Sequence, residues 1–104
     1  MQMEKNNDNS LDSLQDDSQN FVFYVGGDSV MKNAVDLIAH FAKTENLILR
    51  ARGLSIPNAV AIANILTEKM LSGKSKIHKI TVGSETPKEM GRMVSTIEII
   101  ISKN

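Results

Sequence analysis

A ten-residue stretch, from 47 to 56, places the strongest constraint on the fold because it joins a strand, a glycine turn and a helix N-terminus. Leu47–Arg52 is predicted to be a strand, in which successive side chains point to opposite faces. Gly53 permits a turn, and Ser55 can accept a hydrogen bond from a free amide of the following helix. Pro57 suits the first turn of that helix, where its missing amide proton costs nothing. One strand face then carries Leu47, Leu49 and Ala51, and the other carries Ile48, Arg50 and Arg52.

Arg50 and Arg52 therefore lie on the same strand face, next to a helix N-terminus. A guanidinium group can hold a phosphate through two parallel hydrogen bonds, and the free amides at a helix N-terminus favour an anion. The stretch predicts a site for a phosphate-bearing ligand. The alternative is that scattered charges only solvate the surface, and residue spacing does not decide between the two.

The length of 104 residues allows one domain with a single core. Hydrophobic residues make up 41% of the chain, which is enough for a globular fold. The absence of cysteine excludes disulfides, thiolate metal sites and thiol chemistry. No apolar run approaches the roughly 20 residues that a membrane span needs, and the first residues do not resemble a signal peptide. We therefore expect a cytoplasmic protein with no membrane partner.

Charge is divided unevenly along the chain, although its net value is zero. Residues 1–20 contain five acidic residues and one lysine, giving −4, and residues 21–104 carry the compensating +4. The first segment is rich in Asn, Asp, Ser and Gln and cannot bury enough apolar surface to fold. We therefore expect a disordered acidic tail at 1–20 and a folded, mildly basic domain at 21–104.

Apolar periodicity and turn residues divide this domain into six elements. Strands are predicted at 21–25, 47–52, 77–82 and 94–102, and helices at 29–43 and 55–71. The order β-α-β-α-β-β predicts an α/β fold of the α+β two-layer sandwich kind. We expect one four-stranded mixed sheet, both helices on one face, and a long hairpin arm formed by the last two strands, with its tip at 83–91.

The same patterns predict which side chains are buried. In the first helix the inward stripe is Val30, Ala34, Leu37, Ile38 and Phe41. In the second it is Ile56, Ala59, Val60, Ala63, Leu66 and Met70. On the last strand Ile97, Ile99 and Ile101 share one face. On the third strand simple alternation separates Ile77, Lys79 and Thr81 from His78, Ile80 and Val82.

Residues for catalysis are difficult to assemble from this chain. His40 and His78 lie on separate elements, and no H-E-x-x-H motif, nucleophile elbow or Walker loop is present. Gly26 and Gly27 follow the first strand as in a phosphate-binding turn, but Asp28 would repel an anion, so a tight connection is the simpler interpretation. We expect a protein that is not an enzyme and has no cofactor or metal site.

The basic residues are better organised. Arg50 and Arg52 share a strand face, Lys32 lies in the first turn of the neighbouring helix, and Lys88 and Arg92 lie in the hairpin arm. An extended two-stranded arm is one way to reach along a nucleic-acid groove. This distribution is consistent with binding to a sugar-phosphate backbone.

Four segments together resemble the Alba family of small archaeal chromatin proteins, which also has eukaryotic relatives that bind RNA. The first is Phe23-Tyr24-Val25-Gly26 with Val30-Met31. The second is Leu49-Arg50-Ala51-Arg52-Gly53 with Ile56 and Ala59-Val60. The others are Ile80-Thr81-Val82-Gly83-Ser84 and Val94-Ser95-Thr96-Ile97-Glu98-Ile99. The resemblance covers residues 21–103.

The resemblance implies a β-α-β-α-β-β fold, a homodimer, and binding of double-stranded DNA or RNA without strong sequence preference. It also implies a cytoplasmic, chromosome-associated protein that acts in chromatin architecture or in RNA binding. In the dimer the paired hairpin arms would reach towards the minor groove. Its nucleic-acid contacts would be Arg50, Arg52 and Gly53, with Lys88 and Arg92 near the arm, Lys32 close to where the family's usual lysine pair projects, and Gly27 at a position of that pair.

Several residues depart from the family pattern. A lysine pair usually follows the first glycine and is the main phosphate contact, but Gly27 and Asp28 stand there in this chain. Leu54 replaces the basic residue after the arginine turn, and Asn58 replaces a frequent lysine. The salt dependence of binding is the slope of the logarithm of the binding constant against the logarithm of the salt concentration. Each lost phosphate contact reduces the size of this slope by about 0.9 on duplex DNA. We therefore expect weakened DNA affinity.

Two hypotheses follow. The first is a dimeric, largely sequence-independent DNA- or RNA-binding protein, acting alone or with a more basic paralogue. The second is an interaction or assembly subunit, such as a heterodimer partner or ribonucleoprotein scaffold, with little direct nucleic-acid contact. The first requires that Arg50 and Arg52 face an open surface and are not held in internal carboxylate pairs.

The acidic tail either solvates the protein or competes with nucleic acid for the basic face. If it competes, removing it tightens binding to duplex DNA and RNA at low salt, and the gain shrinks as salt screens the charges. Fluorescence anisotropy of the full and truncated proteins across a salt series measures this. An unchanged dissociation constant at low salt would assign the tail to solvation.

Overall fold

Four strands and two main helices follow the predicted order β-α-β-α-β-β through residues 19–104, the range that the computed structural model describes. The strands are β1 (Asn20–Tyr24), β2 (Asn46–Arg52), β3 (Ser75–Glu85) and β4 (Val94–Lys103). The helices are α2 (Val30–Lys43) and α3 (Ile56–Ile65), the latter continued by a π-helical turn at Leu66–Met70. None of the helices within this range is long and apolar enough to cross a membrane.

The predicted tail lies outside the described residues apart from Gln19 and Asn20. The carbonyl of Gln19 accepts hydrogen bonds from the amides of Glu45 and Asn46, at 2.8 and 2.9 Å. Asn20 begins β1, one residue before the predicted start of the domain. A truncation that tests the tail should therefore leave Gln19 and Asn20 in place.

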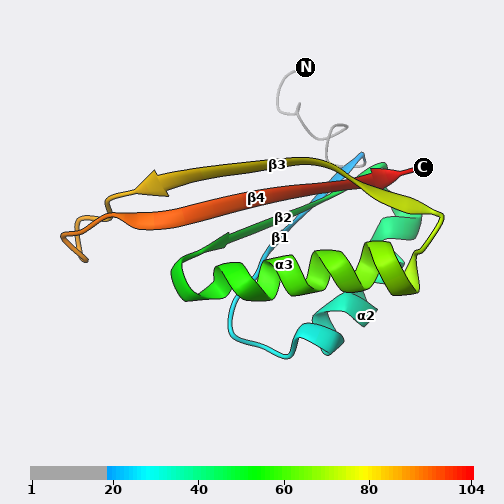
Figure 1. Ribbon diagram of the computed structural model, residues 1–104, viewed down its shortest axis with the longest axis horizontal. Helices are drawn as coiled ribbons and strands as arrows, with labels where there is room; N and C mark the ends of the chain where they lie inside the picture. The colour runs from blue at the N-terminus through cyan, green and yellow to red at the C-terminus, as the bar shows by residue number, and fades with distance from the viewer. Residues whose placement is uncertain (1–18) are drawn as a thin grey trace, which may run out of the picture.

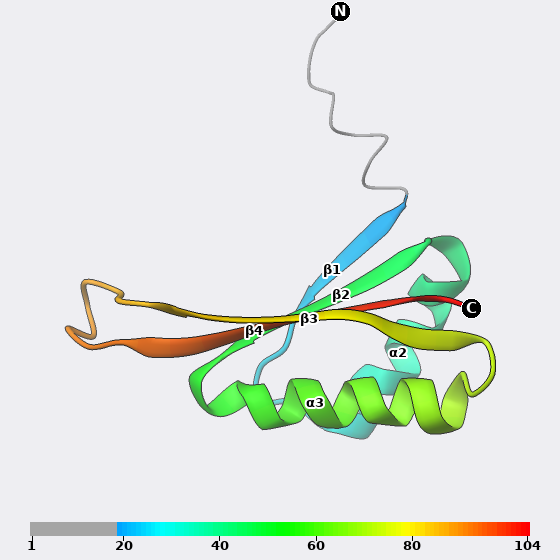
Figure 2. The same ribbon diagram turned by 45° about the horizontal axis from the view of Figure 1, so that its top comes forward.

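The sheet has the strand order β1-β2-β4-β3. Strand β1 pairs with β2 in parallel, and the other two pairings are antiparallel. Both helices cover the same face of this sheet, and the opposite face is turned away from them (Figures 1 and 2). The predicted two-layer fold is confirmed.

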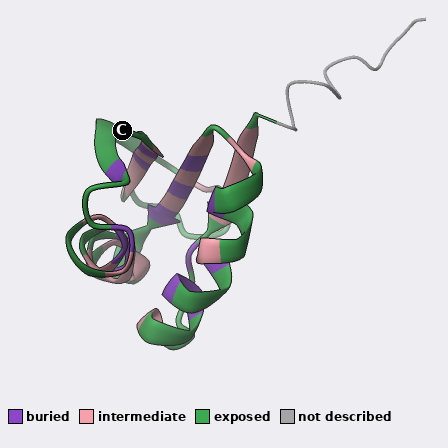
Figure 3. Ribbon diagram, turned by 90° about the vertical axis from the view of Figure 1, so that its right-hand side faces the viewer, coloured by how far each residue is buried: buried purple, intermediate pink, exposed green. Residues whose placement is uncertain are grey.

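The alternation in β2 directs its apolar side chains into the layer between sheet and helices. Leu47 and Leu49 are fully buried, whereas Arg50 is half-buried and Arg52 exposed. The buried residues of the two layers line up where helix and sheet meet (Figure 3). The core comprises Val25, Ala34, Leu37, Phe41, Leu47, Leu49, Ala51, Ala59, Ile62, Ala63, Leu66, Leu71, Ile99 and Ile101.

The two helices begin differently. Ser29 caps α2 by accepting a hydrogen bond from the Lys32 amide at 3.2 Å. The prediction that Ser55 caps the second helix is wrong, because its side chain makes no cap hydrogen bond. Instead, Gly53 adopts a positive φ of 58° and the chain makes a 3-10 turn before α3 begins. Pro57 lies in the first turn of α3, as predicted.

The buried stripe of α3 differs from the predicted one, which did not include the fully buried Ile62. Ala59, Ile62 and Ala63 are buried, but Val60 is 40% exposed, so its predicted burial is wrong. The helix then widens at Leu66–Met70, where the Thr67 hydroxyl donates to the Ala63 carbonyl at 2.9 Å.

A β-bulge changes the predicted faces of β3. The register passes from Ile77 opposite Ile101 to Lys79 opposite Ile100, so β3 contains an extra residue at this point. As a result Ile77, Ile80 and Val82 lie on the same face of the sheet as Ile97, Ile99 and Ile101. The prediction that Ile77 lies on the opposite face from Ile80 and Val82 is therefore wrong. Strands β3 and β4 extend together beyond the rest of the sheet and form the arm (Figure 1).

Candidate nucleic-acid interface

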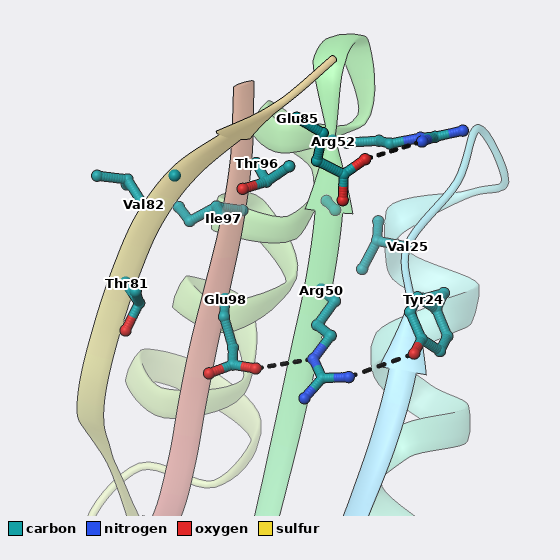
Figure 4. Close-up of a pocket in the computed structure, with 12 residues that line it drawn as sticks. Tyr24, Val25, Arg50, Arg52, Thr81, Val82, Glu85, Thr96, Ile97 and Glu98 are labelled. Atoms are coloured by element: carbon teal, nitrogen blue, oxygen red, sulfur yellow. Dashed lines mark hydrogen bonds and ion pairs between the residues drawn. The ribbon is translucent and has the colours of Figure 1, made fainter. Parts of the chain in front are cut away.

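One row of side chains crosses all four strands on the face turned away from the helices. Tyr24 pairs with Arg50, Arg50 with Glu98, and Glu98 with Thr81 in the sheet register. Figure 4 shows these side chains side by side on β1, β2, β4 and β3, with the helices behind the sheet. Arg52, two residues after Arg50, lies on the same face at the end of β2.

Arg50 is held in the sheet by two neighbours. Its Nε donates to Glu98 Oε2 at 2.7 Å, and its Nη1 donates to the Tyr24 hydroxyl at 3.3 Å. Hydrogen bonding to Glu98, and then to Tyr24, raises the pKa of Arg50 above its ordinary value. The side chain is 43% exposed, and its Glu98 partner is 31% exposed. Arg50 therefore ties β2 to β4 and β1 and is only partly available to a ligand.

The Arg52 side chain is held less firmly than that of Arg50. Its Nη1 donates to Glu85 Oε1 at 3.0 Å, and the two side chains are 60% and 52% exposed. An exposed ion pair contributes only about 0–1 kcal/mol, because solvent screens it. A phosphate can therefore replace Glu85 at little cost.

Both arginines thus have carboxylate partners, so the condition that they are free of such pairs is not met. The Arg50 pair is partly buried and belongs to the sheet. The Arg52 pair is an exposed contact that a ligand can exchange. The open surface is retained, and Arg52 is the more available of the two arginines.

The loop between β1 and α2 carries the largest departure from the family pattern. A Cβ atom at Gly27 would meet nothing within 4 Å, and Gly27 does not have a positive φ. Asn58 Nδ2 donates to the Gly26 carbonyl at 3.0 Å and ties the loop to the start of α3. Neither the space nor the backbone at Gly27 requires glycine, so a larger side chain would fit.

The remaining predicted contacts lie apart from the two arginines. Lys32 is exposed and forms an ion pair with Asp36 at 3.2 Å. Lys88 and Arg92 are exposed in the turn between β3 and β4, at the far end of the arm, and neither has an ion-pair partner within residues 19–104. In one subunit the structure therefore brings together Arg50, Arg52 and Gly53, but not Lys88 and Arg92.

Sequence reasoning missed the carboxylates and the aromatic ring of this face. Glu98, Glu85 and Tyr24 are not among the predicted site residues. These side chains line a groove of about 580 Å³ on the open face. The signal was present in the alternation of the last strand, but using it required knowing that β4 pairs with β2.

His40 packs against an aromatic ring. The His40 ring stacks on Phe21 with 3.8 Å between ring centroids, so it packs at the end of α2. No group of three or more His, Cys, Asp or Glu side chains suited to a metal ion occurs in residues 19–104.

Comparisons with known proteins agree with this geometry. The DNA/RNA-binding protein Alba of Nitrosopumilus maritimus is 32% identical over 84 residues, which are 78% of this chain and 88% of that protein. The DNA/RNA-binding protein Alba of Methanococcus maripaludis is 33% identical over 87 residues, covering 79% of this chain and 97% of that protein.

Solved structures show the same fold. Alba from Thermoplasma volcanium has a TM-score of 0.71 at 31% identity, covering 78% of this chain and 98% of that one. ALBA1 from Trypanosoma brucei has a TM-score of 0.66 at 19% identity, covering 79% and 68%, and is similar in fold alone. Residues 21–84 match the family model described as Alba. The resemblance carried by the four sequence segments is confirmed, and the chain belongs to the Alba family.

Proposed function

We propose that this protein is a dimer that binds DNA or RNA largely without sequence preference, and that it binds duplex DNA less tightly than relatives with the lysine pair. The observation that carries the proposal is Arg52, an exposed guanidinium beside the glycine turn whose carboxylate partner is also exposed. The names of the two relatives, both DNA/RNA-binding proteins, support it. Chromosomal DNA and cellular RNA are both candidate ligands.

Arg52 acts as the exchangeable phosphate contact in this proposal, whereas Arg50 mainly supports the sheet. Two subunits present two such contacts, and the second engages at high effective concentration. Lys32, Lys88 and Arg92 add weaker contacts on the body and arm. With so few contacts, binding is expected to fall quickly as salt rises.

The dimer would form through an apolar strip that the monomer leaves uncovered. It consists of Val60 on α3 and Ile77, Ile80 and Val82 on β3, which are 40%, 39%, 52% and 73% exposed. Strand β3 is the edge of the sheet, so its outer side has no strand partner within the described residues. A second copy of the chain can cover the strip and this edge together.

Replacing Ile80 with Glu tests the dimer. A carboxylate in the buried strip loses water and gains no partner, so the dimer dissociation constant should rise at least about tenfold. Sedimentation velocity over a concentration series measures it. Met31→Glu is the matched control, because Met31 is also 52% exposed but lies on α2. Equal effects of the two substitutions would place the interface elsewhere.

Replacing Arg52 with Ala should weaken binding to duplex DNA and lower the salt dependence by about 0.9 for each contact removed. Glu85→Gln should act in the opposite direction, because it removes the carboxylate that competes with phosphate for Arg52. Anisotropy with labelled duplexes over a salt series reports both. Lys43→Ala, at the end of α2, removes the same charge away from the site. If Arg52→Ala matches this control, Arg52 is not a contact.

Restoring the lysine pair should strengthen binding. The Gly27→Lys, Asp28→Lys double variant fits the loop, and each new phosphate contact should add about 0.9 to the salt dependence on duplex DNA. The control is Ala39→Lys, Glu45→Lys, which changes the charge equally at exposed positions near the end of α2. Equal gains from both variants would mean that only net charge matters.

A second candidate function is an assembly subunit that retains the fold and dimer but makes little direct contact with nucleic acid. The carboxylate partners of both arginines favour it. It would be supported if the wild-type protein, alone and mixed with a more basic paralogue, fails to bind duplex DNA and RNA at low salt. In that case the surface around Arg50 and Arg52 would contact a protein.

A further inference from the structure

We infer that the groove on the open sheet face holds a single unpaired base of a DNA or RNA strand, stacked against Tyr24. This rests on the proposed function and deepens it, because it separates a site for unpaired bases from the contacts that hold any sugar-phosphate backbone. The base class that the groove suits best is one with an exocyclic amino group.

The groove is hollow because two small residues form its floor. Gly83 has no side chain and pairs with Thr96 in the sheet register, and a Cβ at Gly83 would lie 3.2 Å from Thr96 Oγ1. The row of Tyr24 and Arg50 borders the hollow on one side, and the Arg52–Glu85 pair lies on another (Figure 4). Its volume of about 580 Å³ is within the range of small-molecule sites, roughly 300–1,000 Å³.

Tyr24 supplies an exposed aromatic surface in a fixed position. The residue is 71% exposed, so most of a large aromatic ring is open to solvent. Its hydroxyl accepts a hydrogen bond from Arg50 Nη1 at 3.3 Å, and Arg50 Cζ lies 6.0 Å from the ring centroid. Arg50 therefore orients the ring before a ligand arrives, and an aromatic ring beside a cation is the usual platform for an unpaired base.

The polar groups around the hollow can read the edge of a base. Glu98 and Glu85 each use one carboxylate oxygen in an arginine ion pair, so the other can accept a hydrogen bond from an amino group. The hydroxyls of Thr81 and Thr96 line the same groove. Carboxylate acceptors favour adenine, guanine and cytosine, whose amino groups carry two N–H donors, over uracil and thymine, whose edge offers only the single ring N3–H.

A paired base cannot enter this site. Within a duplex the faces of each base are stacked on its neighbours, and only the edges are reachable in the grooves. Stacking on Tyr24 therefore requires a single strand, a loop, or a base turned out of the helix. Arg52, at the rim, is placed to hold the phosphate of the same nucleotide.

The test uses the full chain and three fluorescent probes: a short RNA oligoadenylate, the DNA oligoadenylate of the same length, and a blunt duplex. Tyr24→Leu removes the ring, and Tyr24→Phe retains it. Loss of the ring should weaken binding of either oligoadenylate between roughly five- and a hundredfold, the range for one stacked base. Binding to the duplex should be unchanged, and Tyr24→Phe should retain most of the single-strand affinity.

Two further readouts separate stacking from a structural role. Stacking involves no counterion release, so Tyr24→Leu should leave the salt dependence unchanged while Arg52→Ala lowers it. Tyr24 is the only tyrosine and the chain has no tryptophan, so wild-type emission reports this ring alone. Oligoadenylate should quench it more than oligouridylate of equal length, after correction for absorption by the probe.

A second variant checks the hollow without touching the ring. Gly83→Val fills the floor with a residue that favours strands, provided that the Thr96 side chain shifts by a few tenths of an ångström, and it should reduce single-strand binding while leaving the duplex bound. The inference is overturned if Tyr24→Leu lowers affinity for duplex and single strands equally, or if neither variant affects oligoadenylate binding. Wild-type protein that binds no probe at low salt overturns the proposed function as well. Binding of the RNA but not the DNA oligoadenylate assigns the site to RNA.

Discussion

The pairing of β2 with β4 in the centre of the sheet is the interaction on which both faces of the molecule depend. On the helix side it sets Leu49 opposite Ile99 and Leu47 opposite Ile101, which are fully buried. On the open side the same register sets Arg50 opposite Glu98. Because neighbouring side chains on a strand point to opposite faces, a slip of one residue would bury the charges and expose the core. The fold and the open face are therefore fixed by one register.

Much of the fold follows from local patterns in the sequence. The alternation of Leu47–Arg52, the start of the first helix near residue 29 and the turn at Gly53 each depend on neighbours in the chain, so they could be predicted. The errors have non-local or irregular causes. The bulge in β3 shifts the faces of Ile80 and Val82, and the helix after Gly53 begins with a 3-10 turn that leaves Ser55 unused as a cap.

The candidate site was predicted only in part, for a similar reason. Arg50 and Arg52 could be identified from spacing within one strand. Their partners Glu98 and Glu85 come from strands 48 and 33 residues away, and no local pattern states which strands are neighbours. Tyr24 is not identifiable as a site residue from the sequence, because its exposure depends on both helices packing against the other face of the sheet. The sequence therefore indicated the two arginines but not the two glutamates that form ion pairs with them.

The hydrogen bond from Asn58 to the Gly26 carbonyl has a mechanical consequence. It joins the loop after β1 to the first turn of α3, which follows Arg52 after the short 3-10 turn at Gly53–Ser55. This hydrogen bond holds the two segments next to each other. Any charge placed in the loop, by substitution or modification, would keep a set spacing from Arg52, and that spacing would have to match the distance between phosphates along a strand.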